Sequence, residues 1–308
     1  MAKRPNKEAE MNKRYLPPER FYMPGGTNIY RAQEKRAEIS QVIDFRELER
    51  KRARYRLGYN PRIKKLGKLW NFDIWLVDGN RVRNETYVDF TSGGHAYRYL
   101  YVPLNEIWID SGLEKADIKP TIWHEFTERR FMARCWSYNQ AHDYAARVEI
   151  GIRDGIDFIL PVATFNQSTN YSCGAVALQI VFEYLGKRVS EKQLIRLAKT
   201  TPEKGTDPKD LASTARKLGF KVQWSERWTE AAVRKTLERG YPVIVNFQDT
   251  PQLGEGHYAV IIGYTKDEFI FSDPSRGEDF WKQKVSDFMK RWHELEDKTE
   301  REGIVIYR

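Results

Sequence analysis

The chain has 308 residues, of which 41% are hydrophobic and 31% are charged, and it contains 9 Trp, 17 Tyr and 15 Phe. This length allows two compact domains, and the aromatic content excludes a disordered or low-complexity chain. The net charge of +9 is unevenly spread, because residues 1–70 hold 19 Lys and Arg against 8 Asp and Glu, a net +11, which leaves −2 on residues 71–308. The basic character therefore belongs to the N-terminal segment.

Two cysteines, Cys135 and Cys173, stand 38 positions apart, a number and spacing that favour free thiols in a reducing compartment over a disulfide framework. The N-terminus is charged and no apolar segment follows it, and no run of about 18 apolar residues occurs anywhere. We therefore expect an intracellular protein, cytoplasmic or particle-associated, that is not secreted by a signal peptide and has no membrane partner.

Residues 1–70 predict a basic N-terminal arm and helix. Residues 1–30 combine charge with PP and PGG turns, and residues 31–56 have the alternating charges of an exposed helix. Gly58 and Pro61 end this pattern. Such an arm is suited to docking on an acidic protein or a nucleic acid, and a solvated helix packed on the body of the protein is the alternative.

Residues 71–152 predict a small α+β domain. Aromatic and β-branched residues suggest four short strands, joined by turns, at 73–78, 81–90, 97–102 and 106–110. Two helices follow this β-meander: Pro120 opens the first, and Ser137 caps the second.

These two helices carry a second group of chemically active residues. His124 and Glu128 lie at i,i+4 on the first helix, on the same face as Cys135, and His142 and Glu149 share the inward stripe of the second. Two His and two Glu suit a structural zinc or iron ion, although the HExxH motif of zinc proteases is absent because position 128 is Glu. Because i,i+4 His/Glu pairs are common, a buried hydrogen-bonded network is the alternative. His95, in the Gly93–Gly94 turn, is a further possible ligand, and His293 is predicted to lie on the surface.

Residues 156–308 show helices first and strands later, which is typical of an α+β fold. Cys173 begins an apolar helix, where the helix dipole favours a thiolate, and Gln167 lies six residues upstream in a polar loop. His257 opens one predicted strand and Asp273 closes the next. If those strands pair in antiparallel fashion, the imidazole and the carboxylate become neighbours, so that His257 can serve as the base for Cys173.

The spacing of Gln167, Cys173-Gly174, His257-Tyr258 and Asp273-Pro274 resembles that of the double-glycine leader peptidases, which are papain-like cysteine peptidases best known from bacteriocin exporters. The resemblance covers residues 156–308. It implies that Cys173 is the nucleophile, His257 the base and acid, Asp273 the residue that orients His257, and Gln167 the oxyanion donor. It also implies a peptide or protein substrate and a reaction that needs no cofactor.

The predicted fold is thus a C-terminal papain-like peptidase domain preceded by a small α+β domain and a basic helical arm. Thiol-dependent peptide hydrolysis is the function that this sequence favours. The alternative is a structural or peptide-binding component of a larger assembly, such as a virus particle, in which the peptidase-like domain no longer cuts. Disulfide exchange and isopeptidase activity also stay open.

Overall fold

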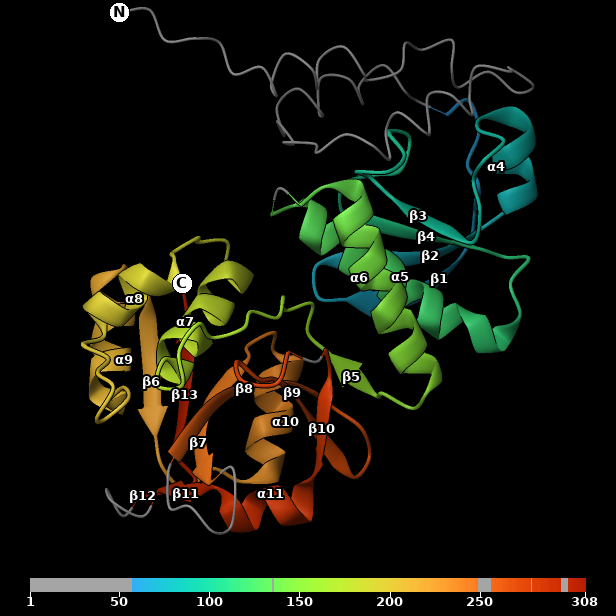
Figure 1. The fold of residues 1–308 in the computed structure, drawn as a ribbon. Coiled ribbons are helices and arrows are strands. Elements are labelled where there is room, and N and C mark those ends of the chain that lie inside the picture. Colours follow the sequence, from blue (N-terminus) through green and yellow to red (C-terminus); the bar gives the residue numbers. More distant parts are fainter. Residues whose placement is uncertain (1–56, 135, 249–255, 278, 295–298) are drawn as a thin grey trace, which may run out of the picture. The chain divides into compact units, whose positions relative to one another are not determined.

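The computed structural model describes residues 57–134, 136–248, 256–277, 279–294 and 299–308. The predicted helix over 31–56, most of the predicted arm, and Cys135 lie outside the described residues. The chain divides into two compact units, the first ending at Asp154 and the second beginning at Gly155. Figure 1 colours the first unit from blue to green and the second from yellow-green to red.

The first unit contains a mixed four-stranded sheet in the order β1-β2-β4-β3. The strands β1 (Arg62–Leu69) and β2 (Phe72–Val77) form an antiparallel pair, β2 runs parallel to β4 (Glu106–Asp110), and β3 (Gly93–His95) pairs antiparallel with β4. Residues 62–69 belong to this sheet, although the sequence analysis assigned them to the arm. The predicted β-meander is wrong, because a parallel pair requires a crossover between its strands.

That crossover contains a helix where a strand was predicted. Asp78 accepts a hydrogen bond from the backbone N–H of Arg81 at 2.9 Å and so caps α4 (Gly79–Glu85). The strand predicted over 81–90 is therefore wrong. The strand over 106–110 is confirmed by β4, and the strand over 73–78 by β2 to within one residue.

The predicted strand over 97–102 is also wrong, because this segment forms turns whose aromatic side chains fill the core of the first unit. Tyr99 and Tyr101 stack with their ring centroids 5.4 Å apart, and Tyr87 packs against Tyr99. The two glycines predicted as a turn form part of β3 instead. A Cβ on Gly94 would lie 2.4 Å from the ring of Tyr99, so only glycine lets the strand approach this ring.

Two helices, α5 (Lys115–Met132) and α6 (Tyr138–Arg153), lie side by side in the first unit (Figure 1). Ser137 caps α6 as predicted, in a capping box with Gln140. Pro120 does not open α5, since the helix begins five residues earlier at Lys115. Both predicted helices exist, and they carry the residues of the second site.

The second unit consists of helices and a largely antiparallel sheet, which confirms the predicted α+β class. Its sheet has the order β10-β9-β8-β7-β13-β6, with β5 paired to β8. The helices are α7 (Cys173–Tyr184), α8 (Glu191–Leu197), α9 (Pro208–Lys217), α10 (Glu230–Glu238) and α11 (Val285–Arg291). The strands of the sheet are β5 (Phe158–Ile159), β6 (Lys221–Ser225), β7 (Val243–Gln248), β8 (Gly256–Tyr264), β9 (Glu268–Ser272), β10 (Trp281–Lys284) and β13 (Gly303–Tyr307).

Helix α7 packs against β8 and is buried along its whole length except at Gln179. A second, two-stranded sheet pairs β11 (His293–Glu294) with β12 (Thr299–Glu300). His293, predicted to lie on the surface, is partly buried in β11. Across the stretches of chain that the structure describes, no helix has the length and apolar character needed to cross a bilayer.

Candidate functional sites

Cys173 is the first residue of α7, and its side chain is almost fully buried, with 9% of the residue exposed. The preceding Ser172 stands at the N-cap, but its hydroxyl donates to Glu191 Oε1 at 2.7 Å and accepts from Thr169 Oγ1 at 2.8 Å. Among the described residues, no side chain therefore caps the first-turn N–H groups of α7. These donors remain directed toward an anion at the position of the thiol.

His257 and Asp273 meet through the pairing of β8 with β9. Val260 lies opposite Ser272 in this antiparallel pair, so His257 and Asp273 occupy diagonal positions on one face of the sheet. The Nε2–H of His257 donates to Asp273 Oδ1 at 2.8 Å. This leaves Nδ1 for the thiol of Cys173.

The carboxylate of Asp273 is fully buried and is held by the turn that follows β9. Its Oδ1 also accepts from the backbone N–H and from the hydroxyl of Ser275, both at 2.8 Å, and its Oδ2 accepts from Arg276 Nε at 3.2 Å. Burial alone would raise the pKa of Asp273, but the hydrogen bonds from His257 and Ser275 bring it below its ordinary value. The group is therefore an anion with a fixed orientation.

Burial by itself lowers the pKa of His257, but hydrogen bonds to Asp273 and to Cys173 outweigh it and raise the pKa to about 10. The imidazole is thus protonated at neutral pH. The structure brings Cys173, His257 and Asp273 into one hydrogen-bonded chain, as the sequence predicts.

Gln167 lies in the loop before α7 and is tied to the turn that carries Asp273. Its backbone N–H donates to the carbonyl of Pro274 at 2.8 Å. Its side-chain Nε2 donates to the carbonyl of Thr169 at 2.8 Å, whereas its Oε1 is buried and meets no hydrogen-bond donor among the described residues. The bond to Thr169 fixes which end of the amide is the nitrogen.

Three residues of this site escape sequence reasoning. Ser275 follows Asp273 by two positions, and that spacing is a recognisable Asx-turn signal. Arg276 and Glu191 have no such signal. Glu191 belongs to α8, and its carboxylate reaches the loop before α7, where it accepts from the backbone N–H of Ser168 at 2.9 Å. Only the tertiary structure places it there.

The structure thus places a buried thiol at a helix start beside a His–Asp pair on neighbouring strands of an α+β unit. Residues 159–300 match the Peptidase_C39 like family. An uncharacterized protein of Methanothermobacter marburgensis is 32% identical over 111 residues, which cover 36% of this chain and 70% of the relative. The chain belongs to the Peptidase_C39 like family through this segment.

Two solved structures are similar to the same part of the chain. The peptidase domain of Streptococcus ComA, a bi-functional ABC transporter involved in quorum sensing, is 22% identical with a TM-score of 0.39, over 46% of this chain and 96% of that domain. A double glycine motif protease from an AMS/PCAT transporter, solved in complex with its leader peptide, is 17% identical with a TM-score of 0.39, over 49% and 94%.

The second site lies in the first unit, outside the segment that matches the family. Helices α5 and α6 bring together His124, Glu128 and His142. The Nε2 of His124 lies 3.1 Å from His142 Nδ1, His142 Nδ1 lies 2.9 Å from Glu128 Oε2, and His124 Nε2 lies 3.7 Å from Glu128 Oε2. Three potential metal-ligand atoms thus converge on one point.

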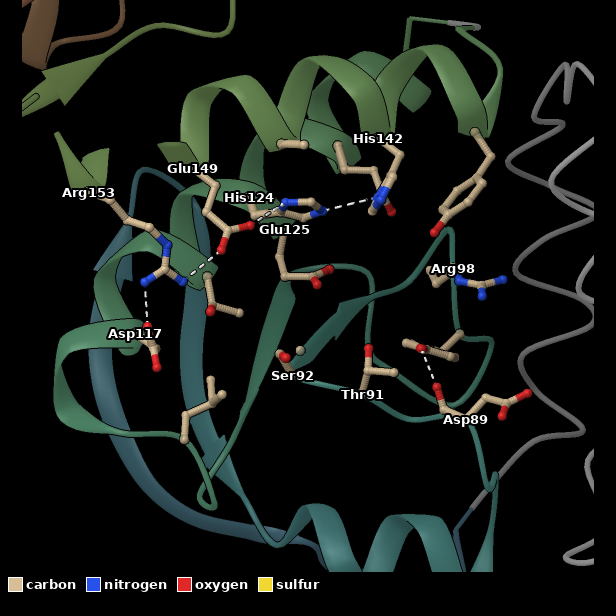
Figure 2. A pocket seen from close by; sticks show the side chains of 17 residues that line it. Asp89, Thr91, Ser92, Arg98, Asp117, His124, Glu125, His142, Glu149 and Arg153 are labelled. Atoms are coloured by element: carbon tan, nitrogen blue, oxygen red, sulfur yellow. Dashed lines mark hydrogen bonds and ion pairs between the residues drawn. The ribbon is translucent and has the colours of Figure 1, made fainter. Parts of the chain in front are cut away.

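The fourth predicted ligand, Glu149, stands behind this group. Its Oε2 lies 2.9 Å from the other ring nitrogen of His124, Nδ1, and its Oε1 accepts from Arg153 at 2.8 Å. Arg153 in turn pairs with Asp117 (Figure 2). The structure therefore brings all four predicted residues together, with Glu149 on the far side of the His124 ring.

His95 is fully buried and completes the surroundings of Glu128. Its Nδ1 accepts from the backbone N–H of Tyr97 at 3.2 Å, so the ring proton is on Nε2, which lies 2.8 Å from Glu128 Oε1 and donates to it. His95 is thus a donor to Glu128. This is the contact role that the sequence allows for His95 beside a ligand role, and His95 also belongs, with Glu125 and Glu128, to a second group of potential metal ligands.

His124, Glu128, His142 and Glu149 line a cavity with a volume of about 590 Å³ (Figure 2). Ser92, Arg98 and Tyr138 line it together with Glu125, which follows His124 on α5. Burial and, second to it, the neighbouring negative charge of Glu128 together raise the pKa of Glu125 to about 8. Gly93 makes room for Glu125, since a Cβ there would lie 2.9 Å from Glu125 Cγ.

Proposed function

We propose that the second unit hydrolyses peptide bonds by thiol chemistry. The observation that carries this proposal is the hydrogen-bonded chain of Cys173, His257 and Asp273. A cysteine at a helix N-terminus beside a protonated histidine exists as a thiolate–imidazolium pair, which is an activated nucleophile.

In the proposed reaction, the thiolate of Cys173 attacks the carbonyl carbon of the substrate. A C–S bond forms while the carbonyl π electrons move to oxygen. As the C–N bond breaks, the imidazolium of His257 gives the Nδ1 proton to the leaving amine. Water then attacks the thioester carbonyl and gives one proton to His257, and the C–S bond breaks to release the carboxylic acid and regenerate the thiolate of Cys173 beside the protonated imidazole.

The negative oxygen formed by this attack needs hydrogen-bond donors. The backbone N–H of Cys173, at the uncapped start of α7, supplies one. Gln167 supplies another, because its Nε2 carries two hydrogens and the carbonyl of Thr169 engages one. The bond from Gln167 N–H to Pro274 keeps this donor near the Asp273 turn.

The test compares the parent protein with Cys173→Ala in two assays: labelling by a thiol-directed peptide electrophile, and cleavage of a peptide library. We expect the parent to be labelled at Cys173 and to cut a subset of peptides, and the variant to do neither. Cys135 is present in both proteins and reports unspecific labelling. Equal labelling and equal cleavage in both proteins would refute the proposal and favour a domain that binds peptides without cutting them.

A further inference from the structure

The three converging atoms of the first unit have the spacing of a metal-coordination face. Tetrahedral zinc with bonds of about 2.0–2.1 Å to nitrogen and oxygen holds its ligand atoms about 3.4 Å apart. The distances among His124 Nε2, His142 Nδ1 and Glu128 Oε2 are 3.1, 2.9 and 3.7 Å, which lie on both sides of this value. Two imidazoles and one carboxylate form a known ligand set of catalytic zinc sites.

The groups behind these three residues are those that orient metal ligands. A ligating histidine ordinarily gives its second ring N–H to a carboxylate, and Glu149 Oε2 lies at ion-pair distance, 2.9 Å, from Nδ1 of His124, although the two atoms do not have hydrogen-bond geometry here. A ligating carboxylate is in turn hydrogen-bonded, and His95 serves Glu128 Oε1 in this way at 2.8 Å. Glu149 and His95 contact the far sides of His124 and Glu128, and this leaves His124 Nε2 and Glu128 Oε2 facing one common point. A metal site requires this arrangement, whereas a hydrogen-bonded network does not.

A metal held by His124, Glu128 and His142 would lie at the wall of the cavity that all three residues line. His142, at the cavity wall, has 44% of its side chain exposed, and Glu125 lies among the lining residues with its carboxylate within 4.8 Å of Glu128. Three protein ligands and one position open to a cavity distinguish catalytic zinc sites from structural ones, which have four protein ligands. A water molecule on a metal bound here would share this cavity with the carboxylate of Glu125.

One edge of the sheet borders the same cavity. The strand β3 is the last in the order β1-β2-β4-β3, and Ser92 and Gly93 line the cavity at its start. An extended peptide can pair with an edge strand through backbone hydrogen bonds. Although the residues of β3 are buried, Ser92 directly before it is exposed and lines the cavity, so a peptide paired at this end would enter the cavity that holds the metal ligands.

We propose that the first unit is a zinc-dependent peptide hydrolase centre in which His124, Glu128 and His142 bind the metal and Glu125 is the general base. The positive charge of a bound metal favours the ionised form of Glu125, so that water at the open position can give a proton to the Glu125 carboxylate while the water oxygen forms a bond to the peptide carbonyl carbon. The C–N bond then breaks, and Glu125 passes the proton to the leaving amine, so the products are a carboxylic acid and an amine. This centre is independent of the thiol reaction.

The metal site is tested on the full chain carrying Cys173→Ala, so that the thiol cannot bind the ion. The protein is stripped with a chelator, titrated with Zn²⁺ or Fe²⁺, and analysed for bound metal and for heat of binding. We expect about one Zn²⁺ per chain, no measurable binding in His124→Ala and His142→Ala, and affinity lowered about 10–100-fold in Glu149→Gln. His293→Ala, which changes a histidine outside the cluster, should bind as the parent does.

Circular dichroism of each variant confirms that it is folded, and Co²⁺ absorption in the parent and in His142→Ala reports on coordination independently of affinity. Absence of zinc binding, preference for Fe²⁺ alone, or equal binding by His124→Ala, His142→Ala and the parent would overturn the proposal.

The catalytic step is tested with a peptide library and the same Cys173→Ala background. We expect zinc-loaded protein to cut peptides, chelator to abolish the cleavage, and Glu125→Gln to keep the metal while losing activity at least about 100-fold. Undiminished cleavage by zinc-loaded Glu125→Gln, or no cleavage by the zinc-loaded parent, would overturn it. Because the thiol is absent throughout, the outcome is separate from that of the thiol proposal.

Discussion

Replacing Asp273 by Asn is the sharpest test of the thiol centre, because it removes one charge and keeps the size of the side chain. The amide oxygen must occupy the position of Oδ1, where His257 and Ser275 donate. The amide NH₂ then faces Arg276, so that two donors oppose each other. A hydrogen bond to a charged acceptor is worth about 1.5–3 kcal/mol against about 1 kcal/mol for a neutral one.

The difference between the two is about 0.5–2 kcal/mol, the middle of which corresponds to about one pKa unit, so the pKa of His257 should fall from about 10 toward about 9. His257 must be protonated to act as the acid. The kcat/KM for peptide cleavage should therefore be lost as the pH rises through about 10 in the parent and about one unit lower in the variant. At pH 10 the variant should be slower by a further factor of about five, relative to its own plateau.

The assay is the pH profile of kcat/KM from pH 6 to 11 with a peptide that the library experiment identifies. Asp287→Asn, which makes the same chemical change on the exposed face of α11, is the matched control and should leave the alkaline limb in place. An alkaline limb that stays at the same pH in Asp273→Asn would refute the assignment of Asp273 as the group that sustains the protonated His257.

Three further substitutions test the surroundings of the thiol. Gln167→Ala should lower kcat about 10²–10³-fold with little change in KM; an unchanged kcat would exclude it as oxyanion donor. Glu191→Ala frees the hydroxyl of Ser172 to cap α7, so alkylation of the thiol should slow across the whole pH range, and an unaltered rate profile would contradict this positioning role. Gly174→Ala adds a Cβ 2.9 Å from Thr206 and should destabilise the fold by about 1–3 kcal/mol in chemical denaturation; undiminished stability would show that Thr206 yields.

The second unit could be predicted well because its signals are local. Capping residues mark the starts of three helices in the sequence. Ser190, Asp207 and Thr229 accept a hydrogen bond from the first turn of α8, α9 and α10, respectively. The strands β7, β8 and β9 are apolar and buried, as their sequences indicate. The strands β6 and β10 were missed because neither has a run of apolar residues: KVQWS alternates but leaves all residues except Val222 exposed, and WKQK has a single apolar residue.

The first unit was predicted less well because aromatic residues signal burial without specifying a strand. Tyr87, Tyr99 and Tyr101 pack on one another from a loop and from turns, where the sequence pattern suggested strands. Residues that favour strands do so largely because their side chains pack well on a half-buried surface. Here the same side chains are buried by tertiary packing from a segment with irregular backbone.

The second site shows the same limit at the level of single residues. Helical spacing brought His124, Glu128, His142 and Glu149 together correctly, but it could not rank them as ligands or as outer partners. That distinction depends on which ring nitrogen of His124 faces which carboxylate, and no sequence spacing encodes it.

The burial of α7 along nearly its whole length has a consequence for the dynamics of the thiol centre. Backbone amides in such a helix exchange their hydrogens with water only when the unit opens globally, whereas loop amides exchange through local fluctuations. Cys173 therefore lies on the slowest-exchanging part of the unit, while Gln167 is held in its loop by two hydrogen bonds, from its backbone N–H to Pro274 and from its side chain to Thr169. A ligand or partner that acts on this loop would change how often the hydrogen bond from the Gln167 backbone N–H to Pro274 opens. Its binding would therefore change the rate of deuterium uptake at Gln167, while the amides of α7 stay protected.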